Sequence, residues 1–233
     1  MELTNTVWAY ATAGFEAPEL FDAVSNAAPE TLALFEPREL ANLVWAFSRA
    51  RVRAPQLFDA VAVEATAKIT KFNPQDLAVC VWAFAKAEVS APHLFDSAAA
   101  DMQNRLGSFQ AQELATAVWA LAKAPDFEAP EFFHAAAEAM RGQASTLKAR
   151  ELATSVWAFA HARVENPQLY ASFAVEASKK ITSFDLRELA LIEETYAAEE
   201  TQQGSNYRLF EAIRAARRRL KARGRLGVDA PQM

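Results

Sequence analysis

Residues 39–49 read ELANLVWAFSR, and close copies follow at residues 76–86 (DLAVCVWAFAK), 113–123 (ELATAVWALAK) and 151–161 (ELATSVWAFAH). The five tryptophans of the chain stand at positions 8, 45, 82, 119 and 157, so successive copies are 37 or 38 residues apart. A bulky residue that returns at a fixed period of this length indicates a tandem structural repeat. Each repeat of such an array packs against its neighbours and leaves a regularly spaced surface for binding.

Other columns of residues keep the same period and place the boundaries of the repeats. An acidic residue followed by leucine opens each unit, as in Glu39-Leu40, and a proline follows near its middle, as in Pro55. The predicted units run 1–38, 39–75, 76–112, 113–150 and 151–187, with a degenerate cap at 188–213 that completes an array over residues 1–213. In the cap, Glu194 stands where tryptophan is expected and Tyr196 keeps the aromatic residue two places later. Residues 214–233 are predicted to form a basic C-terminal helix and tail.

Each unit has the pattern of two helices. The first carries apolar residues at the spacing of an amphipathic helix, namely Leu40, Leu43, Val44 and Phe47. Asn73 and Pro74 supply an N-cap side chain and a proline at the first helical position. The second helix is predicted to run from Pro55 to about Thr70. The predicted fold is therefore all-α, an α-solenoid of about six tandem helical hairpins.

The formal net charge of −5 combines two regions of opposite sign. The residues from Asn206 onward hold eight Lys and Arg against Glu211 and Asp229, and the preceding part of the chain is correspondingly acidic. No apolar run is long enough to span a membrane. Neither a secretory segment nor an arginine-rich transit peptide is visible, because Glu2-Leu3 already enters the first repeat. The single cysteine, Cys80, lies in an apolar helical pattern and is predicted to be a core residue.

A rotation of about 100° per residue places three columns of equivalent positions on the side of the first helix opposite its apolar face. They are the position before the acidic opener, such as Arg38, the position three after the opener, such as Asn42, and the position four after the tryptophan, such as Arg49. These columns are basic or hydrogen-bonding almost throughout and contain no carboxylate. The residues that we predict to bind RNA come from them: Arg38, Asn42, Arg49, Gln75, Lys86, Gln112, Thr116, Lys123, Arg150, Thr154, His161 and Arg187. Acidic residues are expected at helix starts and on the second helices: Asp22, Asp59, Asp96, Glu64, Asp101, Glu138 and Glu176.

Stacked repeats would bring Arg49, Lys86, Lys123 and His161 into a ladder with one cation per repeat, to which the phosphates of single-stranded RNA could bind. The middle column, Asn42, Val79, Thr116 and Thr154, would then lie close to base edges, where its amide and hydroxyl groups can donate and accept hydrogen bonds.

Three alternatives stay open at this point. The basic face can be an ordinary solvated helix surface, and the tryptophans are expected to pack between repeats. The arginine-rich segment from Arg214 to Arg225 can extend a basic groove or only complete a last helix, where the helix dipole favours cations. The acidic side and the aromatic second helices fit a protein-interaction scaffold, a structural subunit of a ribonucleoprotein or other complex.

The motif Glu-Leu-Ala-x-x-Val-Trp-Ala-Phe-Ala-Lys, in residues 39–49, 76–86, 113–123 and 151–161, resembles the octotricopeptide repeat and the related 37-residue repeats that often precede a RAP domain in algal, alveolate and FAST-kinase-like proteins. The resemblance covers residues 1 to about 213. It implies an organellar protein, in a mitochondrion or plastid, that binds RNA in transcript stabilisation, processing, translation or ribosomal RNA assembly. It also implies that variable positions on the first helix, here the column of Asn42, contact bases.

The chain shows no pattern typical of an enzyme. His93, His134 and His161 fall in different repeats at different helical positions, so we expect no metal site. Phosphate-loop and nucleophile-elbow motifs are absent. We therefore expect no catalysis, no cofactor and no small-molecule substrate, and we expect single-stranded RNA as the partner, with protein partners in a ribonucleoprotein complex.

Overall fold

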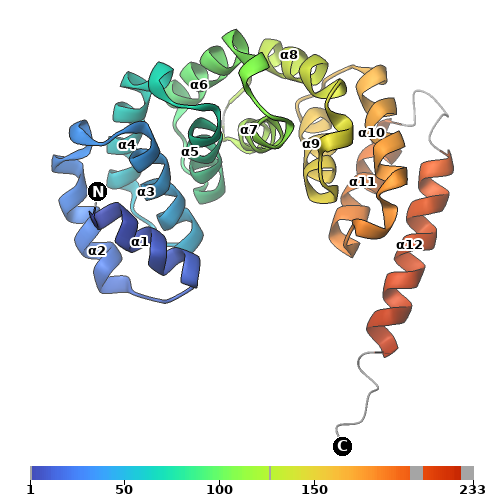
Figure 1. The fold of residues 1–233 in the computed structure, drawn as a ribbon, viewed down its shortest axis with the longest axis horizontal. Coiled ribbons are helices and arrows are strands. Elements are labelled where there is room, and N and C mark those ends of the chain that lie inside the picture. Colours follow the sequence, from blue (N-terminus) through green and yellow to red (C-terminus); the bar gives the residue numbers. More distant parts are fainter. Residues whose placement is uncertain (1, 126, 200–206, 227–233) are drawn as a thin grey trace, which may run out of the picture. The chain divides into compact units, whose positions relative to one another are not determined.

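The computed structural model describes residues 2–125, 127–199 and 207–226, and every element in these residues is a helix (Figure 1). The fold is an α-solenoid, as the repeat pattern predicts. It divides into unit 1, residues 1–136, and unit 2, residues 137–233, which are described separately below. α8 (Pro130–Arg141) runs across this division.

Unit 1 consists of helical hairpins arranged in two layers. The first helices of the repeats, α1 (Glu2–Ala13), α3 (Pro37–Ala50), α5 (Pro74–Ala87) and α7 (Ala111–Lys123), pack side by side in one layer. The second helices, α2 (Pro18–Ala27), α4 (Pro55–Ala67) and α6 (Pro92–Asn104), form the other. Short 3₁₀ helices end the repeats at Ala28–Glu30, Leu32–Leu34 (η2), Ile69–Lys71 (η3) and Leu106–Ser108.

Unit 2 continues the same pattern after η5 (Ala144–Thr146). Its helices are α9 (Ala149–His161), α10 (Pro167–Lys179), α11 (Leu186–Glu199) and α12 (Tyr207–Leu226), with a 3₁₀ helix, η6, at Ile181–Ser183. α9 packs against α10 and α11, and α12 packs against α10, α11 and η6. Residues 201–205, where the sequence places an insertion in the cap, lie outside the described residues.

The second helices end earlier than the sequence predicts. α4 ends at Ala67 rather than near Thr70, and the chain then turns through η3. This tighter turn delivers Phe72 to the core, where it is 1% exposed. Its counterparts Phe109 and Phe184 are also buried, so an aromatic residue closes each of these repeats.

Aromatic side chains join the two layers of unit 1. The rings of Phe21 and Phe47 meet edge to face at a centroid distance of 5.0 Å, and those of Phe58 and Phe84 do the same at 5.0 Å. Each pair links the second helix of one repeat to the first helix of the next. Edge-to-face contacts of buried rings add to the stabilisation from the burial itself, so these pairs hold successive repeats together.

The acidic residue that opens each repeat is part of a helix cap. Asn73 Oδ1 accepts a hydrogen bond from the backbone N–H of Asp76 at 2.8 Å, as its N-cap position predicts. Glu39 Oε2 accepts from the N–H of Glu36 at 2.9 Å, and Glu188 Oε2 accepts from the N–H of Asp185 at 2.9 Å. These carboxylates satisfy N–H groups that a helix leaves without a partner, so the acidic openers have a structural role as caps.

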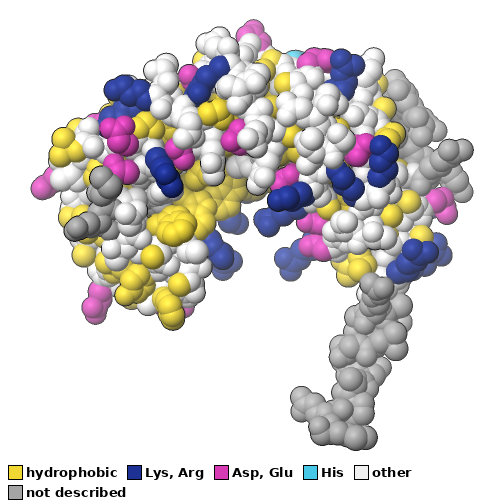
Figure 2. Space-filling view, in the orientation of Figure 1, with side chains coloured by type: hydrophobic (Ala, Val, Ile, Leu, Met, Phe, Trp, Pro, Cys, Tyr) yellow, Lys and Arg dark blue, Asp and Glu magenta, His cyan; other side chains and the backbone are white. Residues whose placement is uncertain are grey.

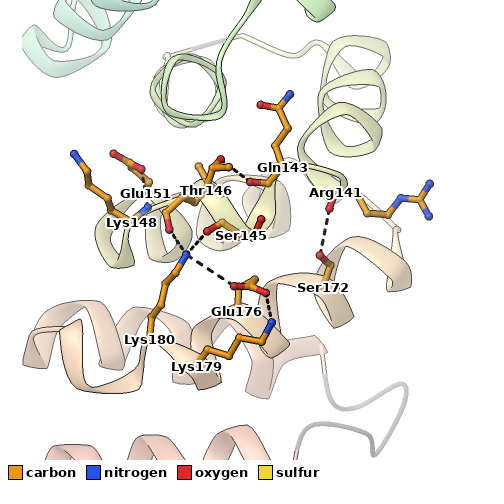
Figure 3. Close-up of polar contacts among 11 residues, drawn as sticks. Arg141, Gln143, Ser145, Thr146, Lys148, Glu151, Ser172, Glu176, Lys179 and Lys180 are labelled. Atoms are coloured by element: carbon orange, nitrogen blue, oxygen red, sulfur yellow. Dashed lines mark hydrogen bonds and ion pairs between the residues drawn. The ribbon is translucent and has the colours of Figure 1, made fainter.

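Two lysines connect neighbouring repeats through their ammonium groups. In unit 1, Lys68 Nζ donates to the carbonyl oxygens of Ala33 and Phe35 at 2.8 and 2.9 Å. In unit 2, Lys180 Nζ donates to the carbonyl oxygens of Ser145 and Leu147 at 2.7 and 2.5 Å (Figure 3). Both lysines reach from the end of a second helix to the 3₁₀ segment that ends the preceding repeat, and so bind carbonyls that the short helix leaves unpaired.

Candidate nucleic-acid interface

The exposed side of each first helix is a stripe of four positions. In α3 these positions are Arg38, Asn42, Trp45 and Arg49, spaced so that they fall within about 60° around the helix axis. Arg38 and Arg49 are exposed, and Asn42 and Trp45 are half-buried between them. Leu40, Leu43, Val44 and Phe47 on the opposite side are 0% exposed. We call these four positions of a first helix the solvent stripe.

Unit 1 brings three solvent stripes next to one another, because α3 packs on α5 and α5 on α7. The stripe of α5 is Gln75, Val79, Trp82 and Lys86, and that of α7 is Gln112, Thr116, Trp119 and Lys123. The outer residues of each stripe are exposed and the inner two are half-buried. Arg49, Lys86 and Lys123 thus occupy one position on three consecutive helices, with their heads in solvent.

The positive charge of these side chains is only partly compensated. In the described part of the chain, Arg49 and Lys86 form no ion pair. Lys123 Nζ lies 3.9 Å from Glu88 Oε1, and both side chains are substantially exposed. An exposed pair at this distance contributes little to stability, so Lys123 can exchange the carboxylate for another anion.

The tryptophans both pack and line the stripe. The indole rings of Trp8 and Trp45 lie 6.2 Å apart, and those of Trp82 and Trp119 lie 6.5 Å apart, each pair at an angle of 35°. The expected packing between successive first helices is confirmed by these contacts. Each ring nevertheless keeps part of its surface in solvent, and Trp8 is 43% exposed. The sequence predicted packing for the tryptophans, and it did not predict the aromatic strip that their exposed edges form between the cations and the middle column of the first helices.

The hydroxyl groups of the stripe have internal acceptors. Thr116 Oγ1 donates to the carbonyl oxygen of Gln112 at 2.9 Å, and Thr154 Oγ1 donates to that of Arg150 at 3.0 Å. In this arrangement both hydroxyls still offer lone pairs to a donor. Asn42 is the residue of this column in α3, and its half-buried amide has both donor and acceptor groups.

Unit 2 carries two further stripes. Arg150, Thr154, Trp157 and His161 form that of α9, and Arg187 opens that of α11. The imidazole of His161 stacks on the indole of Trp157 at a centroid distance of 4.9 Å and an angle of 16°. His161 is exposed, like Arg150 and Arg187, and its ring stacks on its own helix.

The acidic residues assigned to the second helices lie there, as expected, and several of them are paired with cations. Glu64 lies 3.4 Å from Lys68, Asp101 lies 2.5 Å from Arg105, and Glu176 lies 2.6 Å from Lys179. Each pair joins residues three or four positions apart in the sequence and neutralises the carboxylate. Asp22, Asp59 and Asp96 remain exposed at one position of α2, α4 and α6.

The basic C-terminal segment is largely a continuous helix. Arg217 is bonded to Glu193 of α11, which anchors α12, while Arg214, Arg218 and Arg219 are exposed. The side chains of Arg208, Lys221, Arg223 and Arg225 lie outside the described residues.

A pocket of about 710 Å³ opens in unit 1 where α3 and α5 end. Sequence reasoning missed it. Ser48, which lines the pocket, departs from the repeat pattern, since the corresponding residues of the other repeats are Ala11, Ala85, Ala122 and Ala160. This departure is the one sequence signal that could have pointed to the pocket.

Other reactive groups are dispersed or buried. Among the described residues, no three His, Cys, Asp or Glu side chains are grouped as metal ligands, and no helix has the length and apolar character of a membrane span. Cys80 is 0% exposed, which confirms its place in the core. Burial raises the pKa of its thiol to about 12, and the negative charge of Asp76 adds to the shift.

Comparison with known proteins identifies one family. A search of curated proteins found no match. The model of the family described as "RNA-editing substrate-binding complex 6 protein" matches residues 1–167, from α1 to the beginning of α10. Since the matched region is more than half of the 233 residues, the chain belongs to the RNA-editing substrate-binding complex 6 protein family.

Proposed function

We propose that this protein binds single-stranded RNA along the solvent stripes and serves as a non-catalytic binding subunit of a ribonucleoprotein complex. The observation that carries the proposal is the row formed by Arg49, Lys86 and Lys123, which are exposed at one position of three adjacent helices. The family description, which names a complex that binds RNA-editing substrates, supports the same class of ligand.

The proposed strand runs across the first helices with its phosphates at the cations and its bases toward the aromatic strip. Phosphate contacts release condensed counterions and supply most of the affinity. Unpaired bases stack on aromatic side chains, and this contact tolerates any base. Selectivity would come from the column of Asn42, Val79 and Thr116, because these three groups differ in what they can donate and accept. In unit 2, Arg150 and Arg187 would contact phosphates and Thr154 would contact a base.

The finer biological setting rests on the resemblance to octotricopeptide repeats. We propose an organellar protein that acts on transcripts through stability, processing, translation or ribosomal RNA assembly. The match to an RNA-editing family adds editing substrates to this set of RNAs.

The decisive test is the triple variant Arg49→Ala, Lys86→Ala, Lys123→Ala, with binding to a fluorescent single-stranded RNA measured by anisotropy at several salt concentrations. We expect affinity to fall by one to two orders of magnitude at low salt. We also expect the slope of log affinity against log salt to decrease by about 0.7 for each lost phosphate contact.

A matched control removes three exposed cations outside the stripes, Lys71, Arg141 and Lys179. This variant has the same net charge as the test variant and should keep both the affinity and most of the slope. Equal affinities in the two triple variants would refute the proposal, because they would show a response to net charge alone.

A second candidate function, contact with a helical protein partner, is favoured by the exposed face of α1. Leu3 is 45% exposed and Tyr10 is 41% exposed, whereas their counterparts Leu40 and Phe47 are 0% exposed. Phe15, after the end of α1, is 68% exposed. Figure 2 shows hydrophobic side chains gathered on unit 1 where α1 and α3 lie. Apolar surface of this kind on one helix marks a protein contact.

This second function is tested by capture of partners from the native source after nuclease treatment. The variant Leu3→Ser, Phe15→Ser should lose the partner, and Asp59→Asn, Asp96→Asn on the other layer should retain it. Loss with the second variant and retention with the first would instead assign the contact to the acidic second helices.

A further inference from the structure

We propose that the pocket at the ends of α3 and α5 receives one nucleotide of the bound RNA, whose base leaves the solvent stripe and inserts beside Ser48. The inference rests on the proposed RNA-binding function and adds to it a specific base-binding site.

The walls of the pocket are apolar and belong to two consecutive repeats. Val52 and Val89, at equivalent positions of these repeats, are half-buried and line the pocket together with the buried rings of Phe47 and Phe58. Its volume of about 710 Å³ lies in the range of sites that enclose small organic ligands. Nucleobases, which are flat and aromatic with apolar faces and polar edges, are suited to a space with these walls.

The hydroxyl group of Ser48 is the polar group of the interior. Ser48 is 6% exposed, and its Oγ has no hydrogen-bond partner in the described part of the chain. Several other helical hydroxyls donate to the carbonyl four residues earlier, as Thr66 does to Ala62 and Ser178 to Ala174, whereas the buried hydroxyls of Thr4 and Ser155 share the lack of a partner among the described residues. A buried hydroxyl without a partner is unfavourable, and a base edge in the pocket could both donate to it and accept from it.

The rim of the pocket is basic. Arg51, Arg53 and Lys86 line it and are exposed, and Glu88 is the one carboxylate among the lining residues. Lys86 belongs both to this rim and to the solvent stripe of α5. A strand that follows the stripes therefore passes the mouth of the pocket, where Arg51 and Arg53 can bind the phosphate of a nucleotide that turns inward.

The backbone conformation of Arg51 allows a substitution that tests the guanidinium at the rim of the pocket. Arg51 has φ of 58°, a left-handed conformation that glycine adopts more readily than any other residue. The substitution Arg51→Gly should therefore preserve or raise stability while it removes the guanidinium. Arg163, with φ of 56° in unit 2, is the matched control, since Arg163→Gly makes the same backbone change away from the pocket.

Ser48→Ala is an equally conservative probe, because alanine stands at this position in the other repeats. Ser155→Ala removes another buried hydroxyl that has no partner among the described residues, and serves as its control. Binding of the full chain to a short single-stranded RNA is compared with binding to the same RNA carrying one abasic nucleotide at each position in turn.

For the wild type, we expect abasic substitution at one position to weaken binding more than at the others. Ser48→Ala and Arg51→Gly should each weaken binding to the intact RNA about three- to tenfold, the range of one hydrogen bond or charge contact. In both variants, the abasic nucleotide at that position should cause a smaller loss of affinity than it does in the wild type. In the two control variants, this loss should be the same as in the wild type. In a parallel experiment, 4-thiouridine at that position should crosslink to the segments 47–58 or 86–89.

The result that would overturn the inference is normal binding by Ser48→Ala and Arg51→Gly together with crosslinks to other segments. If the triple stripe variant still loses affinity in that case, the proposed RNA-binding function stands and only the base pocket is wrong. If the wild-type protein binds none of the RNAs, both are wrong.

Discussion

Lys123 Nζ of α7 lies 3.9 Å from Oε1 of Glu88, the residue that follows the last turn of α5. The pair joins two repeats, and it brings a carboxylate to a stripe that has none of its own. Glu88 also adopts a left-handed conformation, with φ of 57°. The negative charge of Glu88 therefore opposes binding of an anion at Lys123. Glycine would adopt the backbone conformation of Glu88 with less strain.

The first prediction is that removal of the Glu88 carboxylate strengthens RNA binding. Glu88→Gln should raise affinity about two- to fivefold at low salt, the range for loss of one exposed ion pair with a competing charge. Glu88→Gly should give the same gain and also raise the unfolding free energy by up to about 1 kcal/mol, because it relieves the left-handed conformation. Anisotropy titrations and urea denaturation measure the two effects separately. Weaker binding in both variants would mean that Glu88 itself contacts the RNA.

The second prediction concerns the lysines that bind carbonyls of the preceding repeat. Lys68→Met and Lys180→Met keep the apolar stem of the side chain and remove its ammonium group, so exposed and part-buried carbonyls lose their donor. We expect each to lower the free energy of unfolding by about 1–3 kcal/mol, the range for hydrogen bonds from a charged group. Urea denaturation followed by circular dichroism measures this change.

A control for this prediction lies in the same column of the repeat. Gln143 occupies the position of Lys68 and Lys180 in another repeat, and Gln143→Met should change stability by less than about 0.5 kcal/mol. Equal losses in all three variants would show that the methionine, rather than the missing ammonium group, causes the effect.

The third prediction is a dependence of stability on alkaline pH through Cys80. The folded pKa of about 12 is above the ordinary value of 9.0. As pH rises above 9, the unfolded chain loses this proton while the folded chain retains it, so the free energy of unfolding falls. The fall approaches about 1.4 kcal/mol per pH unit until the folded pKa is reached. Below pH 8 the thiol has no effect on the pH dependence of stability.

The variant Cys80→Ala isolates this contribution, since Ala117 occupies the same position in the next repeat. Its urea midpoint should vary less than that of the wild type between pH 8.5 and pH 10.5. A thiol reagent should modify Cys80 only after unfolding, because the buried thiol is protonated and inaccessible. Rapid modification of the folded protein at neutral pH would contradict the buried position.

The fourth prediction concerns the cap of the array. Tyr196 is 0% exposed, and its hydroxyl donates to the carbonyl oxygen of Tyr170 at 2.8 Å. Tyr196→Phe should lower the free energy of unfolding by about 1–2 kcal/mol, because a buried carbonyl loses this donor. The midpoint of thermal unfolding measures the loss. An unchanged midpoint would indicate that another donor replaces the hydroxyl.

The repeat, the helices and their caps follow from the amino-acid sequence alone. The tryptophan period is visible along the chain, and the apolar face of Leu40 and Val44 and the cap at Asn73 depend on residues within a few turns of one helix. Such local patterns specify a helix and its buried side before any tertiary contact is known. The exposure of Arg49 and Lys86 follows from the same periodicity.

Which groups from different repeats meet depends on the packing of the folded chain. The reach of Lys68 to Phe35, the approach of Glu88 to Lys123, and the pocket beside Ser48 join residues from neighbouring repeats. Their positions depend on side-chain rotamers, on the tight turns that end α4 and α5, and on how closely successive helices pack. A helical period describes rotation about one axis, and it contains no information on the distance between two axes.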